Sequence, residues 1–448
     1  MFLAQKIANS FRMVRRYQVL GWTFSRYGIL GSLSALGLEF GKRGVRWLDP
    51  KKITPTDYDS VFGKSLARTF QELGPTFIKL GQVLASRPDL VGDLVAEELQ
   101  VLFSNVRPIS LKQVRGILNK ELGKAKVTSE FKEIDKNPLG SASIGQTHRA
   151  VLKTGIPVVV KVQKPGVAET VLLDLLLLES AAKSASVVFP KLGILEMFND
   201  FKSSTEREID YREEAKNIQR FRRNYKRLFS TGDVIFPNFY PELSTSRVIV
   251  LEPMRGKPVG QIVKGSRSAS QAAHKTLSAV FEQIFEHGFF HADPHSANMF
   301  FIEEEGRLGF IDLGLVGQLE KRDKQMFVRV IMAIIQRDRK NLAKTLFDLG
   351  TPSTRTSFDG FDKDIQGILD DVKAEGIENI KLEQMVNRLL GTARKHEIYI
   401  PNRYIMMIRS CLIIEGVAKS LDPNVSVMKV AFPVVAKSLL KAYNPFRR

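Results

Sequence analysis

Apolar residues recur at helical spacing through most of the first 130 positions of the chain. Residues 1–48, 58–102 and 110–127 each place apolar side chains three and four positions apart, the period of an amphipathic helix. Over residues 131–162 the period falls to two, which predicts strands. The pattern therefore predicts a helical N-terminal segment followed by a sheet.

Beyond this sheet, helical and strand periods alternate and then become mostly helical. Short strands are expected at 234–235, 247–251, 299–302 and 308–311. Helices are expected at 171–186, 192–228, 274–287, 322–349, 363–379, 382–393, 403–421 and 425–442. Pro433 is expected to kink or break the last helix, because proline cannot donate a backbone hydrogen bond there.

The segment His291–Gly314 combines a polar run with a predicted β-hairpin. A hairpin brings its two ends together, so Asp293, Asn298 and Asp312 should converge. Two carboxylates and an amide oxygen are hard ligands suited to Mg²⁺ on a nucleotide, with one carboxylate left to orient a hydroxyl. The alternative is a surface hairpin flanked by solvated acids, which the unusually polar run between apolar segments disfavours.

Two features of the first sheet point to an anionic ligand. The loop Pro138–Gln146 is rich in small residues whose backbone N–H groups can approach phosphates, although it matches neither a P-loop nor G-x-G-x-x-G. Lys161 lies among β-branched residues of a strand, where a lysine is costly without a carboxylate or phosphate partner. The alternative for Lys161 is an edge strand from which the side chain reaches solvent.

Two helical segments carry further polar candidates. Lys79 and Gln82 share one helix face, and Gly81 between them would let another backbone approach closely. Glu208 and Glu214 are six positions apart, about 240° around a single helix, so they could meet two separate lysines. As isolated patterns, a polar spot on a helix and a solvated charged face are the favoured explanations of these residues.

The net charge of the chain also indicates an anionic partner. The 448 residues include 67 Lys and Arg against 48 Asp and Glu, a net charge of +19. Nucleotide phosphate, an acidic membrane surface or nucleic acid would fit such an excess. The basic residues are dispersed without an aromatic-interleaved stripe, which disfavours nucleic acid.

Other compositional features exclude several classes of site and segment. The single cysteine, Cys411, excludes an intramolecular disulfide and a cysteine metal cluster. We expect neither a secretory signal nor a transmembrane helix, since there is no clean N-terminal apolar core and no run of about 18 apolar residues. The basic N-terminal helix could lie on an anionic membrane or pack on its own domain, and it also resembles an organelle transit peptide.

The order of the motifs predicts the fold. A small-residue loop, a strand lysine, a helix glutamate, an apolar hinge at Val250–Gly256, a loop Asp with Asn five positions later, and Asp-Leu-Gly follow one another. That order is typical of a protein-kinase-like fold, in which two lobes enclose ATP. We therefore expect an α+β, bilobal protein-kinase-like fold with a helical N-terminal extension at 1–130, an N-lobe at 131–256 and a mainly helical C-lobe at 257–448.

Over about residues 15–425 the chain resembles the UbiB/AarF-type atypical kinase family, which is related to mitochondrial coenzyme Q-associated kinase-like proteins. Lys79-Leu80-Gly81-Gln82 followed by Glu208-Ile209-Asp210 carries the resemblance. It implies that Lys79 pairs with Glu208 and Asp210, and that the N-terminal extension covers the region where a protein substrate would bind.

The resemblance also implies a role for each candidate residue. The nucleotide-binding residues would be Gly140, Ser141, Ala142, Ser143, Glu252 and Met254, with Lys161 fixed by Glu214; Asp293 would be catalytic, Asn298 and Asp312 would bind metal, and Lys79, Gln82, Glu208 and Asp210 would be regulatory. The chain departs from the family where Gly140 and Ser141 replace alanine and where Ser296-Ala297 replaces Pro-Gly. It also shows no C-terminal transmembrane helices of the kind many bacterial relatives carry.

The implied function is that of an ATP- and Mg²⁺-dependent atypical kinase or ATPase in isoprenoid-quinone (ubiquinone-type) or other lipid homeostasis. Its partners would be ATP and an anionic membrane surface, a lipid or quinone-pathway proteins, in the cytoplasm, on a membrane or in an organelle matrix. One alternative is a catalytically silent, nucleotide-gated lipid-binding or scaffold protein. Another is a small-molecule phosphotransferase of the aminoglycoside-kinase type, which does not explain Lys79–Gln82.

Overall fold

The computed structural model describes residues 2–27, 55–87, 91–103, 107–188, 193–227, 233–336, 338–352, 356–375 and 382–442. The chain divides into two compact units. Unit 1 comprises Met1–Ile209 with Thr245–Val248, and unit 2 comprises Asp210–Ser244 with Ile249–Arg448. Each unit is described by itself.

Unit 1 contains the helices and the sheet expected in the first half of the chain. Its described helical elements are α1 (Phe2–Arg26), α3 (Pro55–Leu73), α4 (Pro75–Ala85), α6 (Asp93–Glu98), the 3₁₀ turn η1 (Leu99–Phe103), α7 (Leu111–Leu122), α8 (Lys124–Glu130), α9 (Val167–Val188) and α10 (Ile194–Glu208). Pro75 begins α4, where its fixed φ suits the first turn and its missing N–H costs nothing.

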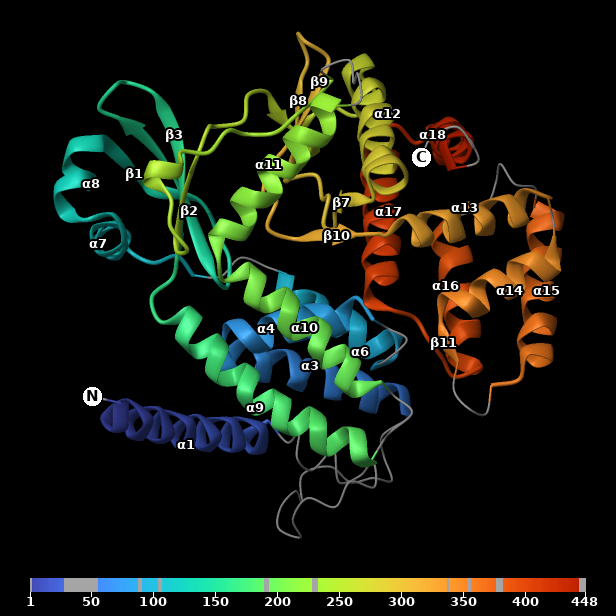
Figure 1. Ribbon diagram of the computed structural model, residues 1–448, viewed down its shortest axis with the longest axis horizontal. Helices are drawn as coiled ribbons and strands as arrows, with labels where there is room; N and C mark the ends of the chain where they lie inside the picture. The colour runs from blue at the N-terminus through green and yellow to red at the C-terminus, as the bar shows by residue number, and fades with distance from the viewer. Residues whose placement is uncertain are drawn as a thin grey trace. The chain divides into compact units, whose positions relative to one another are not determined.

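Helices α3, α4 and α6 lie together (Figure 1). Their apolar side chains form one core. Phe70 and Phe77 are buried in it, together with Leu99 and Leu102 of η1. Phe24 of α1 packs edge-on against Phe77, with ring centroids 6.2 Å apart. The N-terminal helix is thereby packed on α4 of its own unit, which is one of the arrangements expected for it.

A buried ion pair also ties α1 to this unit. Asp174 of α9 has no exposed side-chain surface and receives bonds from Arg16 Nε at 2.6 Å and Nη2 at 2.8 Å. Thr76 Oγ1 donates a third bond to the same carboxylate at 2.7 Å. Arg16 also donates to the Leu73 carbonyl. Three helices therefore meet at one buried carboxylate whose charge is paired and hydrogen-bonded.

The antiparallel strands of unit 1 confirm the change of period at residue 131. They are β1 (Phe131–Ser141), β2 (Gly145–Leu152) and β3 (Pro157–Gln163), in a sheet of order β1-β2-β3-β5. Of strand β5 (Val248–Leu251), the first residue, Val248, belongs to unit 1. Val158, Val160 and Val162 are buried on one face of β3, as strand alternation requires.

The predicted helix at 192–228 is two helices, so that expectation was wrong. Helix α10 ends at Glu208 and α11 (Tyr211–Arg227) begins after Asp210. The Asp210 carboxylate accepts the Arg212 N–H at 3.0 Å, a local bond that competes with helix continuation and starts the next helix. Glu208 and Glu214 therefore lie on different helices. The angle of about 240° between them, which was expected for a single helix, does not apply.

Unit 2 contains four short sheet strands around the predicted hairpin. Strands β8 (Met299–Ile302) and β9 (Arg307–Phe310) pair antiparallel with Met299 opposite Phe310, which confirms the hairpin. Strands β4 (Val234–Ile235) and β6 (Lys257–Pro258) complete the order β4-β9-β8-β6. Two further pairs, β7 (Phe289–His291) with β10 (Val316–Gln318) and β11 (Thr351–Pro352) with β12 (Ile398–Tyr399), are too short to show a period and were not predicted.

The rest of unit 2 is helical, as expected. The single helix expected at 322–349 is two helices, however, so that expectation was wrong: the Asp338 carboxylate accepts the Asn341 N–H at 3.1 Å and caps the start of the second helix. Its main described helices are α11, α12 (Arg267–Phe281) with the π-helical continuation η4 (Glu282–His287), α13 (Lys321–Gln336), α14 (Arg339–Leu349), α15 (Phe358–Glu375), α16 (Leu382–Lys395), α17 (Asn402–Leu421) and α18 (Val427–Ala442). Helix α18 continues through Pro433, so proline does not break it. Across the described residues, we find no helix with the length and hydropathy needed to cross a membrane.

Candidate functional site

The hairpin β8–β9 brings the polar ends of His291–Gly314 together within unit 2. The Ile311 N–H donates to the Asn298 carbonyl at 2.9 Å, which places the residue before Asp312 beside Asn298. Asn298 Nδ2 donates to the Asp293 carbonyl at 3.3 Å. Asn298 is 8% exposed, so this bond also fixes its buried amide. The convergence expected from the sequence is therefore present.

His291 connects the two sides of this site. Its Nδ1 accepts the Asp293 backbone N–H at 3.1 Å, so the ring proton lies on Nε2, which donates to the Ile311 carbonyl at 3.3 Å. Complete burial lowers the pKa of His291, and the Asp293 and Asp312 carboxylates only partly oppose that effect. The neutral ring thus holds the backbone of Asp293 and of the segment before Asp312 in one arrangement.

Asp312 has an unusual backbone conformation. Its φ of 53° lies in the left-handed region, which costs non-glycine residues of order 1–3 kcal/mol and is least unfavourable for Asp and Asn. A Cβ added to Gly314 would lie 3.6 Å from Asp312 Oδ1 and 3.8 Å from Glu214 Oε2. Both carboxylates therefore face the same glycine.

Helix α11 is fixed against this loop. Asn217 Nδ2 donates to the Leu313 carbonyl at 2.9 Å, one turn after the buried Glu214. The sequence assigned Glu214 to Lys161, which belongs to unit 1, and that pairing remains a prediction. Within unit 2, the observed neighbourhood of Glu214 is the Asp312–Gly314 loop.

Sequence reasoning missed the side chains of α17 that hold the loop from His291 to Asn298. Arg409 Nη2 lies 3.4 Å from Asp293 Oδ1, and Ser410 Oγ donates to the His291 carbonyl at 2.8 Å. From η4, Gln283 Oε1 accepts the His291 N–H at 2.9 Å. The available signal was an arginine and a serine within the otherwise apolar stretch 404–414 of this helix, a pattern that indicates polar partners elsewhere in the fold.

The nucleotide-binding candidates of unit 1 lie on β1, on β3 and in the turn between β1 and β2. Lys161 is half-buried in β3 opposite Thr147 of β2. Gly140 and Ser141 are the last residues of β1, so the small-residue loop is shorter than expected. Ala142 and Ser143 form its turn, which closes through the Ala142 N–H bond to the Gly145 carbonyl at 2.9 Å. Their nucleotide-binding roles remain predictions.

Residues 107 and 109 are hydrogen-bonded to side chains close to this turn. Gln146 bonds both backbone groups of Ile109, its Oε1 accepting at 2.7 Å and its Nε2 donating at 3.0 Å. Lys164 Nζ donates to the Arg107 carbonyl at 3.0 Å. The backbone that precedes α7 is therefore fixed against β2 and against the residue that follows β3.

The helix α4 motif has distinct partners for its two polar residues. Lys79 is buried and forms an ion pair with Glu208 of α10, as the family resemblance implies. Gln82 Nε2 instead donates to the Leu102 carbonyl at 2.9 Å. A Cβ at Gly81 would lie 2.2 Å from a Leu102 methyl carbon, so the close approach comes from side chains and not from another backbone.

The remaining candidates have local partners in unit 2. Asp210 is bonded by the Arg212 guanidinium, and this hydrogen bond lowers the pKa of its carboxyl. Glu252 Oε2 accepts from Asn238 Nδ2 at 2.9 Å. Met254 packs against Gly309 of β9, where an added Cβ would approach its sulfur to 2.3 Å.

The hairpin residues fit Mg²⁺. Mg²⁺ is bound by one or two carboxylates with water and substrate phosphates, so a full cage of protein ligands is not required. Because Nδ2 of Asn298 is engaged, Oδ1 is its atom able to bind a cation, and Asp312 supplies a carboxylate. No cluster of three or more His, Cys, Asp or Glu suited to a metal occurs in the described part of the chain.

Comparisons with known proteins identify a kinase-like family. A model of the ABC1 atypical kinase-like domain matches residues 101–346, and a model of the UbiB helical domain matches residues 365–426. A probable protein kinase UbiB of Pseudomonas putida is 31% identical over 443 residues, covering 96% of this chain and 81% of that protein. Another, from Shewanella loihica, is 30% identical and covers 97% and 80%.

A plant relative and a solved structure share weaker likenesses. An aarF domain-containing protein kinase of Arabidopsis thaliana, described as chloroplastic, is 30% identical and covers 93% of this chain and 59% of that protein. The structure of Rv3197 with erythromycin from Mycobacterium tuberculosis aligns with a TM-score of 0.44 and 21% identity over 78% of this chain and 93% of that one.

The family models and relatives confirm the kinase-like fold of mixed helices and sheets with a helical N-terminal extension, and they support the phosphotransferase class. The chain belongs to the ABC1/UbiB family of atypical kinase-like proteins.

Proposed function

We propose that the protein is an ATP-binding, Mg²⁺-dependent atypical kinase or ATPase that acts in isoprenoid-quinone or other lipid homeostasis. The observation that carries the proposal is the convergence of Asp293, Asn298 and Asp312 at the base of one hairpin, with Asp312 in a left-handed conformation. Strained backbone that the surroundings enforce is concentrated at functional sites.

The residues of the hairpin divide the chemistry between them. Arg409 orients Asp293 through Oδ1, which leaves Oδ2 to orient an attacking hydroxyl or water. Asn298 and Asp312 would hold Mg²⁺, and the bound ion would supply positive charge to the phosphates. His291 keeps Asp293 and the Asp312 segment in register, so the site is preorganised before ligand binds.

Unit 1 would contribute the phosphate-binding groups. Lys161 is the candidate for the α- and β-phosphates, with Glu214 as the carboxylate that fixes it. The turn at Ala142 and Ser143 would cover the phosphates through backbone N–H groups. The Lys79–Glu208 pair would restrain unit 1, which would limit access of a protein substrate.

The test is ATP hydrolysis with Mg²⁺, with and without anionic liposomes, for wild type and Asp312→Asn. Removing a ligand to the metal should lower turnover by about 10²-fold or more. Asp348→Asn, an exposed carboxylate of α14, is the matched control and should leave turnover unchanged. Equal turnover in wild type and Asp312→Asn would refute the metal assignment, and nucleotide binding without hydrolysis would favour the scaffold alternative.

The quinone role rests on the family resemblance and needs a separate test. Isoprenoid-quinone content should fall in cells that lack the gene and recover with wild type but not with Asp312→Asn. Unchanged quinone content in the deletion strain would contradict this part of the proposal and leave the ATPase part standing.

A further inference from the structure

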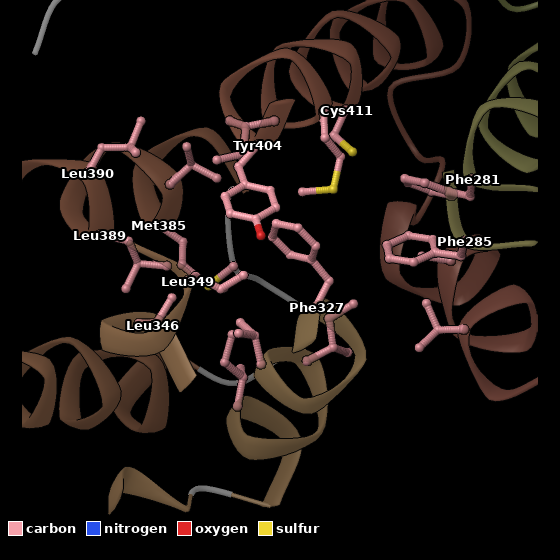
Figure 2. Close-up of a pocket in the computed structure, with 18 of the residues that line it drawn as sticks. Phe281, Phe285, Phe327, Leu346, Leu349, Met385, Leu389, Leu390, Tyr404 and Cys411 are labelled. Carbon is pink, nitrogen blue, oxygen red and sulfur yellow. The ribbon is translucent and has the colours of Figure 1, made fainter. Parts of the chain in front are cut away.

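Unit 2 contains an apolar cavity of about 220 Å³ that none of the candidate catalytic or nucleotide-binding residues lines. Its walls come from α12 with η4, and from α13, α14, α15, α16, α17 and α18. Figure 2 shows Phe327 and Tyr404 near the centre, between Leu346, Leu389 and Leu390 on the left and Phe281 and Phe285 on the right. The cavity therefore belongs to the helical part of unit 2.

The cavity presents almost no polar group to an occupant. Of its lining side chains, Tyr404 donates its hydroxyl to Asp323, and Glu415 is paired with Lys419. Burial raises the pKa of the Cys411 thiol to about 12, so it is neutral. The other lining residues are aliphatic, aromatic or methionine. A polar headgroup would find no partner here.

The wall is open to solvent along α16 and α18. Phe432 is 52% exposed, and Met385, Met428 and Ala431 are only half-buried although all four line the cavity. Water held in such a cavity would lack the two to four polar partners that it needs. Apolar surface kept accessible in this way is typical of a binding site for an apolar ligand.

The volume of the cavity and its lining residues indicate which class of ligand it binds. An apolar cavity of about 150 Å³ binds benzene, whereas sites for whole drug-sized molecules measure about 300–1,000 Å³. The present cavity is intermediate, so it suits part of a larger apolar molecule. Met385, Met407 and Met428 provide flexible thioethers that adapt to a mobile chain. We propose that this cavity binds the aliphatic tail of a lipid, with the headgroup outside.

Helix α17 would connect the tail to the catalytic loop. Met407, Ile408 and Cys411 on one face line the cavity, whereas Arg409 and Ser410 on another face contact Asp293 and His291. A tail that shifts or stiffens α17 would act on the group that orients Asp293. This consequence rests on the proposed function, but the binding site itself does not.

The direct test is calorimetric titration of the full chain, without nucleotide, with straight-chain alkanols from hexanol to dodecanol. Affinity should rise about fourfold for each added methylene and then level off when the cavity is full. Geraniol and farnesol provide a prenyl arm, so the two series distinguish acyl from prenyl tails. An affinity that does not depend on chain length in either series would overturn the proposal, whatever the ATPase result.

Two variants and a control locate the binding. Ala431→Trp fills the cavity and Met428→Gln places an amide in it, so each should weaken the longest alkanol at least tenfold. Lys429→Trp adds the same indole to an exposed position of α18 outside the lining and should bind as wild type. Circular dichroism melts establish that all three fold. Wild-type affinity in both cavity variants, or self-association through this surface in sedimentation, would overturn the proposal.

Discussion

The exposure of the Lys79–Glu208 pair predicts an asymmetric response to mutation. The Lys79 side chain is 9% exposed and that of Glu208 is 32% exposed. Lys79→Met removes the buried cation while keeping the packed stem, and the remaining carboxylate can be hydrated. The expected loss is about 1 kcal/mol or less, the range of exposed pairs. Glu208→Gln instead leaves a buried ammonium beside a neutral amide.

The second substitution should therefore cost more. Breaking a buried pair costs ~3–5 kcal/mol, and the glutamine oxygen still accepts one hydrogen bond, so about 2–3 kcal/mol is expected. Urea unfolding followed by circular dichroism measures both free energies of unfolding. Lys183→Met, in a pair whose lysine side chain is 63% exposed, is the matched control and should change stability little.

The outcome separates a structural from a regulatory role of Lys79. A cost of Lys79→Met equal to or above that of Glu208→Gln would refute the reasoning from exposure. If the pair restrains activity, Lys79→Met should change ATP turnover while the free energy of unfolding stays nearly constant. Unchanged turnover together with unchanged stability would show that the pair does not regulate the site.

Three further outcomes follow from the packing. Gly81→Ala should destabilise by about 1–3 kcal/mol in urea unfolding because its Cβ would overlap a core side chain; an unchanged midpoint would contradict this. Arg16→Ala should cost ~3–5 kcal/mol because Asp174 stays buried, whereas Arg16→Met with Asp174→Leu should recover most of that loss in the same measurement. Because the pKa of His291 is lowered in the folded state, the unfolded state takes up the proton at a higher pH. The free energy of unfolding should therefore be constant above about pH 6.5 and fall below it by up to ~1.4 kcal/mol per pH unit. His291→Asn should reduce this slope.

The helix break at Ile209–Asp210 illustrates why the sequence misled at one point. Apolar spacing continues across 192–228, so periodicity predicted one helix. The structure ends α10 and starts α11 because Asp210 bonds the Arg212 N–H and guanidinium. A local side-chain bond of this kind outweighs helix propensity over one turn, and apolar periodicity does not record it.

The hairpin shows the opposite case. The runs 299–302 and 308–311 with a polar turn between them predicted β8 and β9 almost to the residue. Convergence of Asn298 with the Asp312 segment followed, because antiparallel pairing is a short-range consequence of the turn. The roles assigned to these residues, and the division of the chain at 130 and 256, remain predictions.

The sequence by itself determined the periods, the hairpin, the order of the motifs and hence the family. Only the tertiary structure decided which distant side chains complete the site. Arg409 reaches Asp293 across 116 positions, and Arg16 reaches Asp174 across 158. Likewise, the apolar cavity exists only where residues from α12, η4 and the helices α13 to α18 meet. Periodicity follows from each element's own geometry, whereas these contacts depend on how the elements pack, and no local pattern encodes that.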